Sequence, residues 1–209
     1  MKTRTFHHLL PVLFAFFAAI PTVSRAGLFY SGVQNVPIPL TIDGVFLRMS
    51  DGTTTGSTPA DWSTAPWLNP FLGGTWVENS PLLLPVITGT SQIVNLASGT
   101  VVGTGSNFVT GDSFSSTHTG LASNQFQVGT PGIMGFEFET SVGGPEYYGW
   151  LRMTVNNAGA GNIVDWAYNN TAGTPVLAGI SSVPEPATAI VGLALSGVAM
   201  LRRRRMRGC

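Results

Sequence analysis

The sequence predicts an all-β protein, an antiparallel β-sandwich or jelly-roll-like single domain. Gly, Thr, Ser and Asn dominate the central part of the chain, where no long apolar pattern at i, i+3 and i+4 occurs. β-branched and aromatic residues stand there in short runs instead. Turn signals such as Asp-Gly and Pro-Gly separate the runs at short intervals. Many short strands with frequent turns are typical of two-layer β structures.

Each expected strand is a short run rich in β-branched or aromatic residues, bounded by turn residues. In chain order the expected strands are 28–30, 36–40, 44–49, 75–77, 82–87, 92–96, 100–102, 107–109, 125–128, 133–139, 147–155, 162–168 and 176–178. The segment between 58 and 70 is bounded by prolines and is expected to be a loop.

The clearest strand signals lie in the C-terminal third. Phe136, Glu137, Phe138 and Glu139 alternate apolar and acidic side chains. This alternation predicts that both Phe side chains point into the core and both Glu side chains point to solvent. With the strands at 147–155 and 162–168, this segment is expected to form an antiparallel meander.

The first 26 residues are typical of a secretory signal peptide. Lys2 and Arg4 precede an apolar core at 9–20, and small residues around Arg25 supply a cleavage site after Ala26. The domain expected to be exported then spans residues 27–182.

The C-terminal segment 183–209 combines three features in order. An uncharged apolar stretch occupies 187–201, and at ~1.5 Å per residue its 15 residues would form a helix about 22 Å long. A bilayer core is ~30 Å thick, so this single transmembrane helix is short for a permanent anchor. The arginines that follow predict a cytoplasmic C-terminus. The motif before the helix is Val183, Pro184, Glu185 and Pro186, and the basic stop after it is Arg202, Arg203, Arg204 and Arg205.

This tail resembles the PEP-CTERM sorting domain of Gram-negative bacteria. The resemblance implies that an exosortase-type enzyme recognises the Pro-Glu-Pro motif and removes the helix and the basic tail. It also implies a transient stay in the inner membrane, followed by delivery to the cell surface or the extracellular polysaccharide. An ordinary single-span anchor is the alternative interpretation of the tail.

The domain itself resembles a recurrent domain of PEP-CTERM proteins, which implies one compact extracellular domain and no known activity. The residues that carry this resemblance are Tyr30-Ser31-Gly32 with Asn35, Trp67-Leu68-Asn69-Pro70, residues 148–155, residues 165–168 and residues 173–179.

The charge of the expected exported domain excludes some partners. It has two basic residues, Arg48 and Arg152, and nine acidic residues, so its net charge is 2 − 9 = −7. Two cations cannot neutralise a run of phosphates, which argues against nucleic-acid binding. An anionic membrane or acidic polymer is an equally poor partner unless a divalent cation bridges the two. The only cysteine, Cys209, lies in the tail, so no disulfide is expected.

Two features could carry catalysis, but we expect no catalytic residue. Glu137 and Glu139 stand at i and i+2 with Cα atoms about 7 Å apart, and paired carboxylates serve glycoside hydrolysis. Acidic residues that alternate with Phe more often form the solvent-exposed face of a sheet. His118 is the only histidine between residues 27 and 182, and we expect it to lie in a polar loop without a chemical role.

Oxygen-rich turns and tryptophans are the candidate binding groups. Turns at 51–54 and 111–113 could supply oxygens to calcium, although Asp and Gly there also suit plain turns. No other cofactor is expected. Trp62 and Trp67, in the proline-bounded loop, are the tryptophans expected to be exposed for contact with a glycan.

The sequence therefore predicts an exported structural or adhesive protein that is not an enzyme and that associates with exopolysaccharide. The alternatives are a secreted glycan-active hydrolase and a carbohydrate-binding module.

Overall fold

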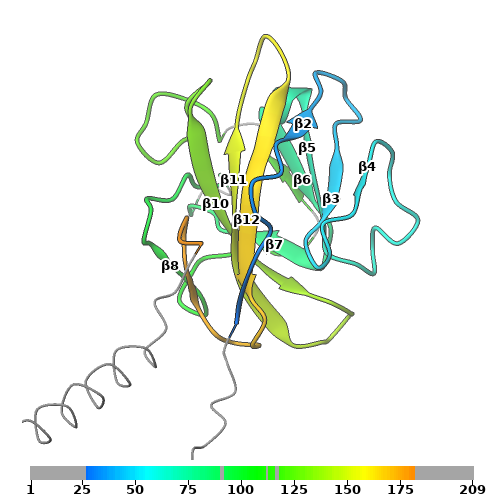
Figure 1. Cartoon of the computed structure of the whole chain (residues 1–209), viewed down its shortest axis with the longest axis vertical. Helices are drawn as coiled ribbons and strands as arrows, with labels where there is room; N and C mark the ends of the chain where they lie inside the picture. The colour runs from blue at the N-terminus through cyan, green and yellow to red at the C-terminus, as the bar shows by residue number, and fades with distance from the viewer. Residues whose placement is uncertain (1–26, 90–91, 112, 116–117, 182–209) are drawn as a thin grey trace, which may run out of the picture.

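The computed structural model of the chain describes residues 27–89, 92–111, 113–115 and 118–181 (Figure 1). The expected signal peptide at 1–26 and the expected sorting segment at 183–209 lie outside the described residues. The described part of the chain contains no helix that is long and apolar enough to cross a bilayer. Its one helical element is the short 3₁₀ turn η1, Leu72–Gly74.

The larger sheet, sheet A, has six strands in the order β1-β12-β11-β10-β7, with β2 also paired to β12. Every pairing in it is antiparallel. The strands are β1 (Leu28–Tyr30), β2 (Val36–Ile38), β7 (Leu83–Pro85), β10 (Pro131–Glu139), β11 (Glu146–Thr154) and β12 (Gly161–Asn169).

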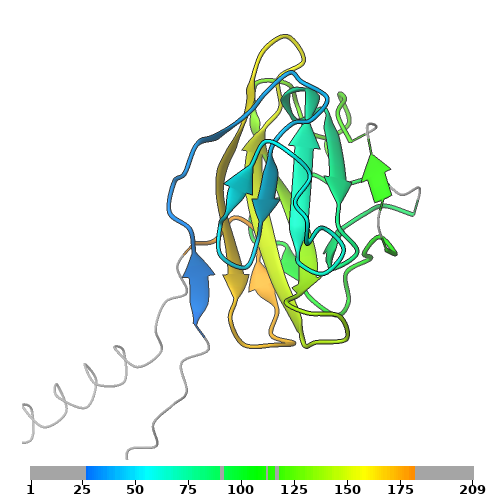
Figure 2. The ribbon, with the colours of Figure 1, turned by 90° about the vertical axis from the view of Figure 1, so that its right-hand side faces the viewer.

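The second sheet, sheet B, has five strands in the order β4-β3-β5-β6-β9, and it is antiparallel as well. Figure 2 shows sheet B in front of the long strands of sheet A, so the predicted all-β, sandwich-like antiparallel fold is confirmed. A separate strand pair forms from β8 and β13. The strands are β3 (Phe46–Arg48), β4 (Thr54–Thr55), β5 (Trp67–Phe71), β6 (Trp76–Asn79), β9 (Ser113–Ser115), β8 (Val101–Val102) and β13 (Val176–Leu177).

The strands β10, β11 and β12 form the predicted meander. Phe136 lies opposite Gly149, and Leu151 lies opposite Trp166. Phe136 and Phe138 are buried, as the alternating pattern predicts. They belong to a core shared by the two sheets, to which sheet B contributes Leu47, Leu68 and Val77 among others.

The outer face of the meander is buried too, which the sequence does not predict. Tyr148 and Trp150 of β11 and Ala167 of β12 pack with Val102 and Val176 of the β8–β13 pair. Val86, Leu96 and Phe108, from the segment between β7 and β8 and the residues that follow β8, pack in the same cluster. The centre of sheet A is thus covered on both sides. The centre of sheet A is therefore the middle of three layers.

Three of the expected strands are wrong in detail. The segments at 92–96, 107–109 and 125–128 contribute only isolated bridges to their partners. Residues Ile93 and Phe126 are buried in the core even so. These runs are apolar because their side chains are buried against the sheets, not because they form strands within them.

Strand β5 occupies part of the segment that was expected to be a loop. Pro70 has no N–H to donate, which argues against a central strand. Its carbonyl oxygen nevertheless accepts from Val45 N at 3.1 Å. Oriented to suit its neighbours, the buried Asn69 amide donates to the carbonyl oxygens of Asp43 at 3.1 Å and Val45 at 3.2 Å. This side chain replaces the donor that Pro70 lacks.

Substitution of Gly149 tests the packing inside the sandwich. A Cβ at Gly149 would overlap the Phe136 ring and lie 2.7 Å from the Ala167 carbonyl oxygen. We expect Gly149→Ala to lower the free energy of unfolding of the full chain by about 1–3 kcal/mol in urea titrations. The control Gly56→Ala, at a site with no atom within 4 Å, should change it by less than about 0.5 kcal/mol. Equal stabilities of the two variants would contradict this packing.

Candidate functional site

Trp67, one of the two tryptophans expected to be exposed, is 2% exposed, so the exposure predicted for it is wrong. Its indole N–H donates to Asp61 Oδ1 at 3.0 Å, and the Arg48 guanidinium lies 5.1 Å from the ring centroid. The loop between β4 and β5 folds back over the outer face of sheet B and buries the ring. Its indole is therefore not free to stack on a sugar.

Trp62 is partly buried. Its ring meets Phe46 edge to face at 5.5 Å, and it packs against a small cluster of Phe46, Ala65 and Trp67. This contact leaves part of the indole accessible, so Trp62 keeps its place as a candidate for contact with a glycan.

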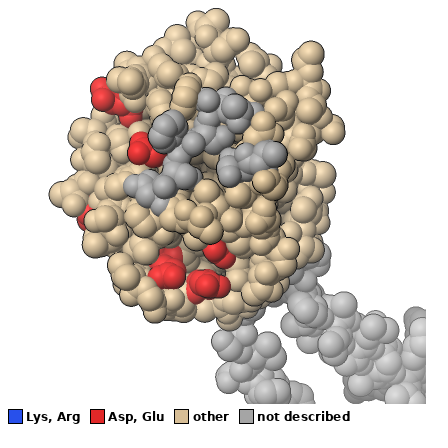
Figure 3. Space-filling view, turned by 180° about the vertical axis from the view of Figure 1, so that it is seen from behind, with Lys and Arg blue, Asp and Glu red and all other residues tan. Residues whose placement is uncertain are grey.

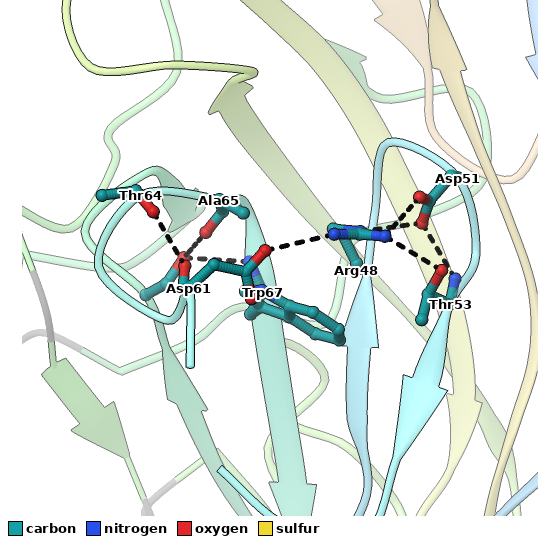
Figure 4. Close-up of polar contacts among 8 residues, drawn as sticks. Arg48, Asp51, Thr53, Asp61, Thr64, Ala65 and Trp67 are labelled. Atoms are coloured by element: carbon teal, nitrogen blue, oxygen red, sulfur yellow. Dashed lines mark hydrogen bonds and ion pairs between the residues drawn. The ribbon is translucent and has the colours of Figure 1, made fainter. Parts of the chain in front are cut away.

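Arg48 fastens the same loop to sheet B (Figure 4). Its guanidinium donates to both oxygens of Asp51, at 2.7 and 3.0 Å, and to Asp61 Oδ2 at 3.1 Å. Burial acts to raise the pKa of Asp51, but hydrogen bonds from Arg48 and Thr53 outweigh burial and lower it. In the turn expected to offer oxygens to calcium, the Asp51 carboxylate is thus engaged with a cation of the protein.

Arg152 secures the end of the described chain. It lies 3.5 Å from Asp165 Oδ2, which also accepts from the Tyr30 hydroxyl at 2.8 Å. Asp165 is 1% exposed, so the ion pair reaches into the sheet. Arg152 Nη2 donates to Gly179 O at 3.2 Å, and the neighbouring Trp150 indole donates to Ile180 O at 3.3 Å. These bonds hold the turn after β13 against β11.

A hollow of about 90 Å³ at one end of β10 brings carboxylates together. Its lining includes Glu137 and Glu139, the predicted pair, and also Glu146. Glu146 starts β11 directly opposite Glu139. We call this hollow the glutamate hollow. Glu146 was not among the sequence candidates, although the turn signal at Gly143-Gly144 would have placed it near Glu139.

Two of these carboxylates already have partners in their own hairpin. Glu139 Oε2 accepts from Gly144 N at 3.1 Å, and Glu146 Oε2 accepts from the Tyr148 hydroxyl at 3.1 Å. Burial, followed by the hydrogen bond to Glu146, raises the pKa of Tyr148 to about 12, so this hydroxyl remains a donor. Both carboxylates therefore help to hold the hairpin.

Glu137 differs from the solvent-facing residue that the sequence predicts. It is half-buried, opposite Leu84 on one side and Tyr148 on the other. Burial, with the charges of Glu146 and Glu139, raises its pKa to about 7. The Glu137 carboxyl is thus poised to exchange a proton near neutrality.

His118 is fully buried, which the polar sequence around it does not indicate. Its Nε2 lies 2.9 Å from Gly74 O, and its ring meets Phe126 edge to face at 5.6 Å. The imidazole ties the segment between β9 and β10 to the η1 turn. The calcium candidate at 111–113 cannot be placed, because Asp112 lies outside the described residues. Among the residues that are described, no three His, Cys, Asp or Glu side chains group as metal ligands.

No family model, curated protein or solved structure matches this chain.

The raised pKa of Glu137 predicts a stability that falls as pH rises. The folded state holds the proton up to about pH 7, whereas the unfolded chain loses it near 4.5. Unfolding therefore becomes easier between these two values and changes no further above them. Glu137→Gln removes this loss. At pH 4 the free energy of unfolding of the variant should therefore equal that of the wild type. Above pH 7 it should exceed the wild type by about 1–2 kcal/mol, a figure reduced for the partial exposure of Glu137.

Urea titrations of the full chain at several pH values measure this difference. Asp43→Asn, which removes an exposed carboxylate, is the matched control and should leave the pH dependence of the wild type in place. Parallel curves for Glu137→Gln and wild type from pH 4 to 8 would rule out the raised pKa.

Proposed function

We propose that the chain is an exported protein that an exosortase-type system sorts to the cell surface or the extracellular matrix. The observation that carries this proposal is the order of sequence signals at 183–209: the motif from Val183 to Pro186, an apolar stretch too short for a lasting anchor, and the arginines from Arg202 to Arg205. The signal peptide at 1–26 supports the same route.

The domain between these signals serves as a structural or adhesive component associated with exopolysaccharide. Both of its arginines are used internally: Arg48 pairs with Asp51 and Asp61, and Arg152 pairs with Asp165. Among the described residues, the face seen in Figure 3 presents acidic side chains and no basic ones. Such a surface suits a neutral polysaccharide better than nucleic acid or an acidic polymer.

Mass spectrometry of the protein exported by a Gram-negative host with an exosortase tests the sorting. We expect the wild-type product to lack residues 1–26 and the segment that follows the Pro-Glu-Pro motif. Replacing Pro184 and Pro186 by Ala, or Arg202 to Arg205 by Ala, should leave the C-terminus intact and the protein in the inner membrane.

The matched control is the double variant Pro37→Ala/Pro39→Ala, which changes two prolines away from the signal. It should be processed like the wild type. Unchanged processing of the motif and arginine variants would reject the sorting proposal and leave an ordinary anchor as the better explanation.

A glycan-active hydrolase is the second candidate, because the glutamate hollow holds a carboxyl whose pKa of about 7 suits a general acid. The bonds that Glu139 and Glu146 make within the hairpin favour the structural role instead. We expect no release of reducing ends from neutral polysaccharides. Release that Glu137→Gln abolishes and Asp43→Asn preserves would establish the hydrolase.

A further inference from the structure

A second and larger hollow lies between the two sheets, at the same end of the sandwich as the glutamate hollow. Its volume is about 200 Å³. Phe138 lines both hollows. We call it the aromatic hollow. Its lining residues are Ser50, Phe138, Thr140, Tyr147, Tyr168 and Asn170.

Aromatic rings form the floor of this hollow. Phe138 stacks on Tyr147, its partner in the β10–β11 register, with ring centroids 5.3 Å apart. It meets Tyr168 of β12 edge to face at 5.1 Å. Phe29, which is 37% exposed, stacks on Tyr168 at 4.7 Å and extends the aromatic surface toward β1. Tyr147 and Tyr168 are only partly buried, so their rings reach the surface.

The floor is held in place before any ligand arrives. The Tyr168 hydroxyl of sheet A donates to Ser50 O at 3.1 Å. Ser50 lies in the turn after β3, so this bond links the two sheets. Asn170 Oδ1 accepts from Gly27 N at 2.9 Å. Fixed rings lose little conformational entropy on binding, which favours recognition by stacking.

Polar groups surround the rings. Within the described part of the chain, the hydroxyl groups of Ser50, Thr140 and Tyr147 make no hydrogen bond to another residue. The Asn170 amide nitrogen adds a donor at the surface. A purely apolar ligand would cover these groups without satisfying them, which is costly. A ligand with an apolar face and hydroxyls at its edge satisfies both parts of the site.

The charge and the volume of the hollow restrict the class of ligand further. None of the six lining residues is charged, and the nearby Asp51 carboxylate is engaged by Arg48 at 2.7 Å. Acids of the domain outnumber its bases, so an acidic sugar would be repelled. Pockets that enclose drug-sized ligands measure ~300–1,000 Å³. A hollow of about 200 Å³ is suited to one ring of a longer chain.

We propose that the aromatic hollow binds one pyranose unit of a neutral polysaccharide. The C–H face of the sugar ring stacks on Tyr147 and Tyr168, and its hydroxyls bond to Ser50, Thr140 and Asn170. This inference rests on the proposed association with exopolysaccharide and gives it a defined site. It places the contact away from Trp62.

Calorimetric titration of the full chain tests the proposal, in a zwitterionic detergent without a sugar headgroup. The probes are cellohexaose, maltohexaose and mannohexaose as neutral sugars and an alginate hexasaccharide as an acidic one. We expect binding of at least one neutral probe and no tighter binding of alginate. Tyr147→Ala should weaken that binding about tenfold or more, because it removes a stacking ring. Thr140→Val should weaken it about threefold through loss of one hydrogen bond.

Trp76→Ala is the matched control, since it removes a partly buried aromatic ring of β6, and its affinity should equal that of the wild type. Trp62→Ala removes the ring of the rival candidate site. Circular dichroism checks that each variant is folded; if Tyr147→Ala is not, Thr140→Val decides. The proposal fails if no neutral probe binds, if alginate binds tightest, if Trp62→Ala causes the loss, or if the hollow variants bind like wild type. These outcomes leave the sorting proposal intact, because the mass of the exported protein tests it separately.

Discussion

Burial of the β10–β12 meander on both faces is the constraint on which the rest of the structure depends. One face packs against sheet B through residues such as Phe136 and Leu151, and the other packs under the β8–β13 pair through Trp150 and Ala167. The domain has no cysteine, so this burial and the sheet hydrogen bonds must supply its stability. The two arginines bind segments beside the meander: Arg48 holds the loop over sheet B, and Arg152 holds the end of the described chain.

Both hollows lie where the ends of β10 and β11 extend beyond their neighbours. Strands β10 and β11 continue to Glu139 and Glu146, while the pairing of β7 with β10 ends at Leu83 and Phe138. Successive side chains of a strand point to opposite faces. Glu137 therefore belongs to the outer side with Tyr148, and Phe138 belongs to the inner side with Tyr147. One strand end thus offers an acidic surface on one side and an uncharged aromatic surface on the other.

The sequence predicts the long strands well, because Phe136 to Glu139 carry a strict alternation and the turns beside them are rich in glycine. It fails at β5, because the missing donor of Pro70 is replaced by the Asn69 side chain, a compensation that depends on the tertiary fold. It also predicts strands at apolar runs such as that around Ile93, which makes only an isolated bridge. A segment packed against a sheet and a strand within a sheet need the same apolar composition.

The candidate sites were less accessible to sequence reasoning. Burial of Trp67 under its own loop and burial of His118 depend on contacts with distant residues, including Arg48 and Gly74. The raised pKa of Glu137 depends on Glu146 across the hairpin. The aromatic hollow joins residues of three strands and a loop of the other sheet, and no local pattern marks such a set. Signals at the ends of the chain, by contrast, are read from consecutive residues.

Native-state hydrogen exchange of the full chain tests the central claim most directly, because it ranks the stability of each segment. The account predicts that the slowest amides lie at the centres of β10, β11 and β12 and exchange only through global unfolding. Amides in the loop between β4 and β5 and in the described segments between β7 and β10 should exchange faster. Slower exchange in sheet B than in the meander, or local opening of the meander below the global free energy of unfolding, would contradict it.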